Sequence, residues 1–205
     1  MLTLNITVVT KSNLYIGGMS QGFEIGGIDM STVTRNGMPY IPASSFKGAL
    51  REICKHHENN AVAALYEKYF DPEGKITKKH LFVFGVPGRN DTPKLLFNDF
   101  TCTSKSKGNN LFSIDMKNSI TEIDGELLSN PRTYRVAREG LTFQSLIYFK
   151  MLDMEYSSQK LIKDYMIEMC NKFNDGFYRL GNSKSRGYGW IEVDVNDVEQ
   201  RGQGS

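Results

Sequence analysis

The chain has 205 residues, of which 40% are hydrophobic and 23% charged, and 25 Lys and Arg against 23 Asp and Glu give a formal net charge of +2. This composition predicts one globular domain and excludes a disordered or fibrous chain. The apolar runs are too short to span a bilayer and no secretory signal is visible, so we expect no membrane partner. Cys54, Cys102 and Cys170 are few and far apart, which argues against disulfides and for a cytoplasmic protein.

Hydrophobic periodicity and turn-forming residues predict the elements of the first half. In chain order they are a strand from Leu2 to Val8, a glycine-rich stretch at 16–29, a helix that begins at Ser44-Ser45, a second helix at 61–70, a short apolar run at 81–84 and a strand at 94–101. The apolar residues of the strand alternate with polar ones, whereas those of the first helix recur at intervals of three and four.

The second half predicts a long hairpin followed by a strand, a helix and a glycine-rich turn between two strands. In chain order the elements are a loop at 105–110, a hairpin at 111–138 with its tip near Asp124-Gly125, a strand at 141–152, a helix at 161–173, and strands at 178–180 and 190–193. This order predicts a ferredoxin-like α+β fold in one domain of residues 1–198, decorated by the hairpin and glycine-rich loops and followed by a flexible tail at 199–205.

Asp29 directly follows the glycine-rich stretch. Adjacent glycines let a ligand approach the main chain, and a carboxylate placed there can contact water, a metal ion or a ribose hydroxyl. The spacing by itself favours a simpler interpretation, in which Asp29 caps a backbone N–H in a turn.

The first helix combines two hydroxyl groups with two cations. Ser44 and Ser45 lie at its start, where free N–H groups favour anions, and Lys47 and Arg51 are four residues apart, so they share a face that can follow two phosphates. Gly48 costs about 1 kcal/mol relative to alanine inside a helix, which suggests that something packs closely against it. An ordinary capped helix with a solvated basic face explains the pattern equally well.

The loop from Leu180 to Trp190 contains three glycines, two serines and two cations without an acidic residue. Such a loop can form a nest of amides and charges for a phosphate backbone. Its glycine spacing matches neither a P-loop nor a dinucleotide fingerprint, and a flexible hairpin turn is the alternative interpretation.

Cys54, His56, His57 and His80 raise the question of a zinc site. Cys54 belongs to the apolar series of its helix, and the spacing matches no common site, so zinc is disfavoured. All three histidines lie outside the glycine-rich loops, which leaves histidine acid–base catalysis with little support.

Four segments together resemble a known family: Gly26-Gly27-Ile28-Asp29, the block from Pro39 to Arg51, Asn130-Pro131-Arg132, and Ser185-Arg186-Gly187-Tyr188-Gly189. The sequence resembles the RAMP superfamily (repeat-associated mysterious proteins) of CRISPR systems over nearly its whole length. It is most similar to the repeated backbone subunit of type III, Csm-like effector complexes.

The resemblance implies an RNA-recognition-type palm, copies of which stack along one CRISPR RNA beside other type III subunits. The hairpin at 111–138 would be a thumb inserted between guide and target RNA, and Asp29 would be the catalytic residue that cuts target RNA beside it. A divalent cation, Mg²⁺ or Mn²⁺, is implied, with its protein ligands unknown. The implied RNA-binding residues are Ser44, Ser45, Lys47, Arg51, Arg132, Ser183, Lys184, Ser185, Arg186 and Gly187.

Two alternatives accompany this hypothesis. The chain can be a purely structural filament subunit in which Asp29 is only a turn residue. It can also be a CRISPR RNA-processing endonuclease of the same superfamily, although such enzymes often rely on a loop histidine, which the late loop lacks.

Overall fold

The computed structural model describes residues 2–17, 27–70, 77–89, 94–104, 108–123, 126–150 and 154–197. Five predictions therefore lie partly or wholly outside the described residues: most of the glycine-rich stretch, the first half of the loop at 105–110, the two tip residues of the hairpin, the end of the strand at 141–152 and the C-terminal tail. The described part is a mixed α+β fold built on an antiparallel sheet, as predicted.

The main sheet has seven strands in the order β10-β1-β9-β6-β4-β3, with β5 also paired to β9. The strands are β1 (Leu2–Thr10), β3 (Thr34–Arg35), β4 (Met38–Ile41), β5 (Lys94–Phe97), β6 (Phe100–Cys102), β9 (Thr142–Lys150) and β10 (Ile191–Asp197). The predicted first strand is confirmed, because Leu4, Ile6 and Val8 are buried while the residues between them are half-exposed.

The helices α1 (Ala43–His56), α2 (Asn60–Phe70) and α3 (Tyr156–Asn171) pack with the sheet around one core. Phe46 of α1 lies at the centre of this core, with ring centroids 4.6 Å from Phe100 and 5.6 Å from Phe173. Four 3-10 helices complete the fold: η1 (Lys79–Phe84), η2 (Gly108–Leu111), η3 (Lys172–Asp175) and η4 (Lys184–Arg186). No helix in the described ranges is long and apolar enough to cross a membrane.

Three predicted boundaries were wrong. The strand expected at 94–101 is divided into β5 and β6, whose registers on β9 differ by one residue, so Asn98-Asp99 forms a bulge. Helix α3 begins at Tyr156 rather than at 161. The prediction started too late because the first turn of the helix is largely polar and adds nothing to the apolar periodicity. The segment 178–180 is irregular, and the hydrogen bond from Leu180 N–H to Gly189 O joins it to the returning chain.

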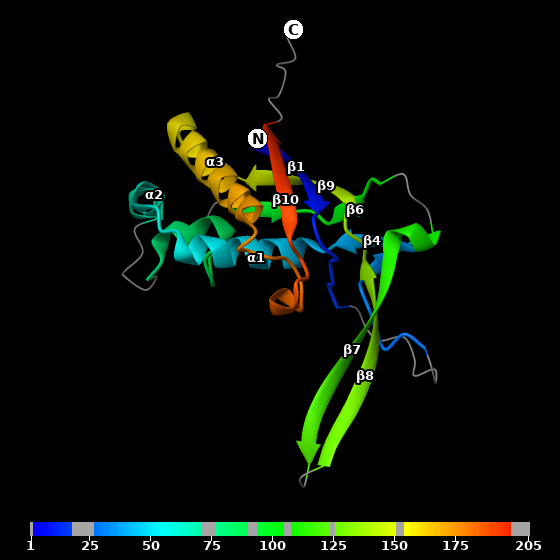
Figure 1. The fold of residues 1–205 in the computed structure, drawn as a ribbon. Coiled ribbons are helices and arrows are strands. Elements are labelled where there is room, and N and C mark those ends of the chain that lie inside the picture. Colours follow the sequence, from blue (N-terminus) through cyan, green and yellow to red (C-terminus); the bar gives the residue numbers. More distant parts are fainter. Residues whose placement is uncertain are drawn as a thin grey trace.

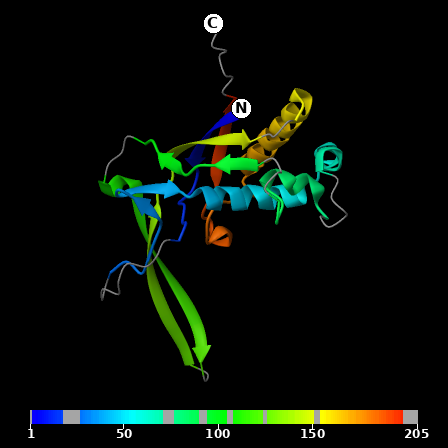
Figure 2. The same cartoon turned by 180° about the vertical axis from the view of Figure 1, so that it is seen from behind.

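The hairpin projects from the main sheet, as Figures 1 and 2 show. Strands β7 (Phe112–Ile123) and β8 (Glu126–Ala137) pair along their whole length, which confirms the two arms of the predicted hairpin. The short strand β2 (Met30–Ser31) runs parallel to the base of β8 and completes a second, three-stranded sheet. A bridge between Leu14 and Ala137 ties this sheet to the end of β1.

Candidate nucleic-acid interface at the base of the hairpin

Asp29 lies at the edge of the hairpin, exposed to solvent. Its backbone N–H donates to Thr133 O at 3.0 Å, and its Oδ2 accepts the Thr133 N–H at 2.6 Å. The carboxylate therefore caps a backbone N–H, as the simpler interpretation predicted, but that N–H belongs to β8 rather than to a local turn. This contact holds Asp29 at the edge of β8 next to Thr133, whose neighbour in the strand, Arg132, is exposed.

A cluster of aromatic rings joins the hairpin to the late loop. Tyr15, Tyr134 and Tyr188 are buried together, with Met30 packed against them. Lys117 Nζ lies 3.6 Å from the ring centroid of Tyr188 and 4.8 Å from that of Tyr134. Burial lowers the pKa of Lys117, and the nearby guanidinium of Arg186 lowers it further. Two cations, one from the hairpin and one from the late loop, thus face the same region.

Asp115 is the acidic partner within this cluster. Its carboxylate accepts hydrogen bonds from Tyr188 Oη, from Asn13 Nδ2 at 3.1 Å and from Ser113 Oγ at 2.9 Å. Burial by itself raises the pKa of Asp115, but these donors and Lys117 outweigh it and hold the pKa below its usual range. Asp115 therefore stays ionised near neutral pH and fastens the late loop to β7.

The late loop, from Leu180 to Trp190, packs closely against the main chain that follows β1. Gly181 and Gly189 have φ angles of +80° and +77°, and an added Cβ would lie 2.3 Å from Tyr15 O and 1.9 Å from Leu180 O. The loop can pass this close to the main chain only because both positions lack side chains. Backbone hydrogen bonds from Asn182 to Tyr15 and from Gly189 to Asn13 hold it at both ends.

The tip of this loop presents the predicted phosphate-binding residues. Lys184 to Arg186 form the single turn η4, flanked by Ser183 and Gly187, which both have positive φ. The side chains of Lys184, Ser185 and Arg186 are exposed, and that of Ser183 is half-buried. The turn thus offers two cations and two hydroxyls to solvent beside the hairpin.

The start of α1 differs from the prediction. The helix begins at Ala43, whose N–H donates to Asp99 Oδ1 at 2.8 Å, so the capping oxygen comes from the β-bulge rather than from either serine. This hydrogen bond, and then the ion pair of Asp99 with Arg35 at 2.6 Å, lower the pKa of Asp99. A carboxylate at the helix N-terminus repels anions, so phosphate binding there must rely on side chains.

Ser44, Lys47 and Arg51 share one face of α1, whereas Ser45 lies about 100° around the helix from Ser44. Ser44 and Arg51 are exposed, and Ser45 and Lys47 are half-buried. Arg51 also lines a cavity of about 420 Å³, whose other lining residues are Lys55, Thr77, Lys78, Leu81, Phe82, Gly85, Val86 and Pro87. Lys55 and Lys78 form ion pairs with neighbouring glutamates, Glu52 and Glu58, which neutralise much of that wall.

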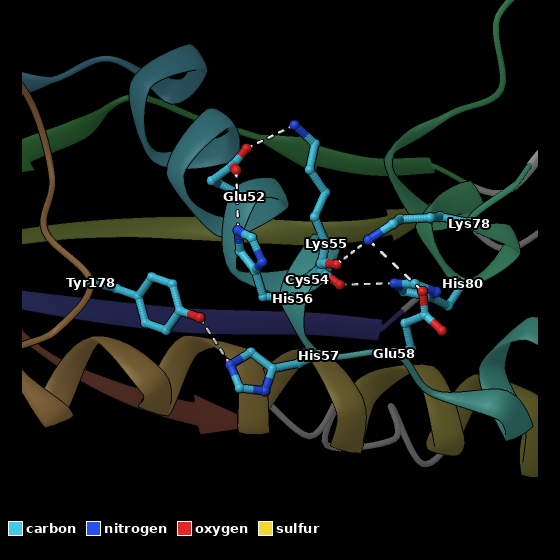
Figure 3. Close-up of polar contacts among 9 residues, drawn as sticks. All are labelled: Glu52, Cys54, Lys55, His56, His57, Glu58, Lys78, His80 and Tyr178. Atoms are coloured by element: carbon cyan, nitrogen blue, oxygen red, sulfur yellow. Dashed lines mark hydrogen bonds and ion pairs between the residues drawn. The ribbon is translucent and has the colours of Figure 1, made fainter.

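The cysteine and histidine residues near the end of α1 diverge, as Figure 3 shows. His56 pairs with Glu52, His57 Nε2 lies 3.0 Å from Tyr178 Oη, and His80 Nε2 lies 2.8 Å from Cys54 O. Burial raises the pKa of the Cys54 thiol to about 12. Among the described residues, no three His, Cys, Asp or Glu side chains gather closely enough to hold a metal ion.

Asp29 fits a divalent cation only as one ligand among several. Its Oδ2 is engaged by Thr133 N–H, which leaves Oδ1 as the oxygen available for an ion. Mg²⁺ commonly keeps several waters and binds through one or two carboxylates plus substrate phosphates, so a lone exposed carboxylate suits an ion delivered with RNA.

Of the predicted residues, the structure brings Asp29, Arg132 and the late loop to the hairpin. The predicted residues of α1 lie on a separate element, where Arg51 lines a cavity with residues of η1. Asp29 and Arg132 lie on or against β8, and the late loop contacts β7 through Tyr188. Strand β4, which leads directly into α1, contacts η2 at the foot of β7. Three residues of the site were not predicted: Asp99, Asp115 and Lys117. For Lys117 the sequence held a signal, because a tip at 124–125 places it opposite Arg132.

Comparison with known proteins gives the same family. A model of the RAMP superfamily matches residues 7–192. The CRISPR system Cms endoribonuclease Csm3 of Streptococcus thermophilus is 29% identical over 193 residues, which cover 88% of this chain and 81% of that protein. The cryo-EM structure of the type III-B Cmr-beta bound to cognate target RNA contains a chain with the same fold, at a TM-score of 0.62 and 20% identity; the match covers 96% of this chain and 60% of that one. The chain belongs to the RAMP superfamily.

Proposed function

We propose that this protein is the backbone subunit of a type III CRISPR interference complex, in which it binds guide RNA and cleaves the paired target RNA at regular intervals through Asp29. Its partners would be CRISPR RNA, target RNA, further copies of itself and other type III subunits in the cytoplasm. The family, the relative named an endoribonuclease and the fold shared with a target-bound complex support this proposal.

The main sheet and its helices would form a ferredoxin-like palm. Strands β10, β1, β9 and β5 follow one another in the antiparallel order of that fold, with helices in the two connections. The hairpin would act as the thumb that separates guide from target, since it extends well beyond the palm (Figure 1).

The observation that carries the proposal is the position of Asp29. An exposed carboxylate is fixed to the base of the hairpin, beside Arg132, and the late loop lies against the same hairpin. Target RNA held at the thumb would pass this carboxylate, while guide RNA contacts the cations of α1 and the late loop. Such contacts reach the backbone, so guide–target pairing would supply sequence specificity.

Cleavage would use the RNA's own nucleophile. The 2′-hydroxyl attacks the adjacent phosphorus, the P–O5′ bond breaks, and the products are a 2′,3′-cyclic phosphate and a 5′-hydroxyl. A nucleotide displaced by the hairpin can reach the in-line geometry that an A-form duplex prevents. Asp29 Oδ1 would accept the 2′-hydroxyl proton or hold a divalent cation, Mg²⁺ or Mn²⁺, which would neutralise charge on the phosphate.

Asp29→Asn in the assembled complex separates catalysis from structure. The amide oxygen can still accept the Thr133 N–H, so the complex should assemble and bind RNA normally, yet target cleavage should fall about 100-fold or more. Asp194→Asn on β10 removes the same charge elsewhere and should cleave normally. A chelator should abolish cleavage by the unmodified complex, and end analysis should find the cyclic phosphate. Unchanged cleavage by Asp29→Asn contradicts the catalytic role.

A non-catalytic filament subunit is the second candidate, and one observation favours it. The hydrogen bond between Asp29 and Thr133 gives the carboxylate a structural role that needs no chemistry. If the complex binds target RNA but never cuts it, with or without a divalent cation, this candidate is correct.

A further inference from the structure

Two aromatic side chains remain exposed beside the late loop. Phe177 is 82% exposed, and Trp190, the single tryptophan of the chain, is 40% exposed. Neither belongs to the residues that the proposed function uses. The two residues are neighbours in space, because the ring of Trp190 lies against Gly176, the residue before Phe177.

Both aromatic residues are held in place. A Cβ added at Gly176 would lie 3.3 Å from Trp190 Nε1, so the absence of a side chain lets the indole rest on the main chain. The backbone N–H of Trp190 donates to Ser12 Oγ at 3.0 Å, which fixes the main chain from which the indole projects. The ring of Phe177 meets that of Tyr178 edge-on, with centroids 5.2 Å apart, and Tyr178 is fixed by its hydrogen bond to His57 (Figure 3). Exposed rings that already rest against a neighbour lose less entropy when a ligand covers them than unrestrained side chains do.

The charge of this segment favours an anionic ligand. From Gly176 to Ile191 the sequence contains Arg179, Lys184 and Arg186 and no carboxylate. The acidic residues that flank the segment are Asp175 and Glu192, and Glu192 forms an ion pair with Lys11 at 3.1 Å. Aromatic faces next to a run of cations are the combination that binds single-stranded nucleic acid, since bases stack on rings while phosphates meet the cations.

We propose that Phe177 and Trp190 form a stacking site for unpaired RNA bases, with the adjoining phosphates at Lys184 and Arg186. This proposal rests on the proposed function, because it takes the late loop to bind RNA. It extends the RNA path beyond that loop to the start of β10. Removing one ring should weaken the binding of a short single strand roughly 5- to 150-fold.

The single tryptophan makes the test direct. The purified full-length chain is titrated with a single-stranded RNA octamer while Trp190 emission is followed, and in parallel with an abasic octamer of the same charge. Stacking should quench the emission with the base-containing strand and leave it nearly unchanged with the abasic strand. Phe177→Ala should weaken RNA binding by the factor above. Tyr156→Ala removes a ring that is 76% exposed on α3 and serves as the matched control, with unchanged affinity.

Three results would overturn the stacking site. They are an unchanged Trp190 emission at every RNA concentration, equal quenching by the abasic strand, and equal affinities for Phe177→Ala and Tyr156→Ala. Emission that changes with protein concentration before RNA is added would mean that a second copy covers the two rings. Target cleavage by the assembled complex is measured separately, so a failure of the proposed function is recognised independently of this site.

Discussion

Gly48 offers a prediction in which folding stability and RNA affinity change in opposite directions. It lies in the middle of α1, is exposed, and an added Cβ would meet no atom of the described chain within 4 Å. The expected close packing at Gly48 is therefore absent within the described chain. No contact there requires a glycine, so Gly48 lowers the stability of the helix without a packing reason. Gly48→Ala should raise the free energy of unfolding by about 1 kcal/mol and the Tm by about 2–4 °C.

The effect on RNA has the opposite sign if the guide backbone lies on this face. Gly48 lies on the exposed side of α1 next to Ser44 and Arg51, so a methyl group there would hold a phosphate backbone away from the main chain of the helix. We expect Gly48→Ala to weaken guide RNA binding about 10-fold, equivalent to about 1.4 kcal/mol. Thermal unfolding and fluorescence anisotropy with labelled guide RNA measure the two effects. A variant that is more stable and binds RNA as tightly as the original would refute the placement of RNA on α1.

Two further predictions concern the late loop. Tyr188→Phe removes one donor to Asp115 and should lower the free energy of unfolding by about 1.5 kcal/mol at neutral pH, measured by urea unfolding. Because the pKa of Asp115 is held below its ordinary value, its ionised form stabilises the fold above about pH 4 and this contribution is lost as the pH falls further, so the difference between Tyr188→Phe and the original should narrow in acid. Gly189→Ala places a Cβ against Leu180 O at positive φ and should cost about 3 kcal/mol, measured in the same way.

Each of these two substitutions has its own control variant. Tyr165→Phe also removes a tyrosine hydroxyl, but one that donates to the backbone carbonyl of His57 at 3.0 Å, so its effect should depend little on acid pH. Gly187→Ala keeps the positive φ and meets nothing within 4 Å, so it should cost less than Gly189→Ala. A pH-independent loss in Tyr188→Phe, or equal losses in the two glycine variants, would contradict the described packing.

Periodic segments were the part of the fold that the sequence predicted well. The alternation in β1, the spacing of Phe46 and Leu50 in α1 and the symmetric hairpin each express one dominant local pattern. The bulge at Asn98-Asp99 could not be predicted, because Asp99 there accepts a hydrogen bond from the N–H of Ala43, a helix start 56 residues earlier in the chain. The polar first turn of α3 similarly carries no periodic signal.

The sequence predicted those residues of the candidate site that belong to recognisable glycine-rich motifs. Asp29 and the late loop stand beside glycines, which mark close approaches of the main chain. The partners that position them, Thr133 for Asp29 and Asp115 for the loop, come from the hairpin and became visible only when the strands were paired. The two serines at the start of α1 suggested a serine cap. The capping oxygen instead comes from Asp99, in the bulge before the neighbouring strand β6.

The most direct test of the whole account is a map of guide RNA on the protein surface. Photocrosslinking of the assembled complex with 4-thiouridine in the guide should join RNA to the face of α1 that carries Lys47 and Arg51, and to the late loop around Arg186. Crosslinks confined to the other face of the sheet, around Gln144 of β9 and Thr7 of β1, would contradict it. In that case the base of the hairpin would not be the RNA-binding site, and Asp29 would lose its substrate.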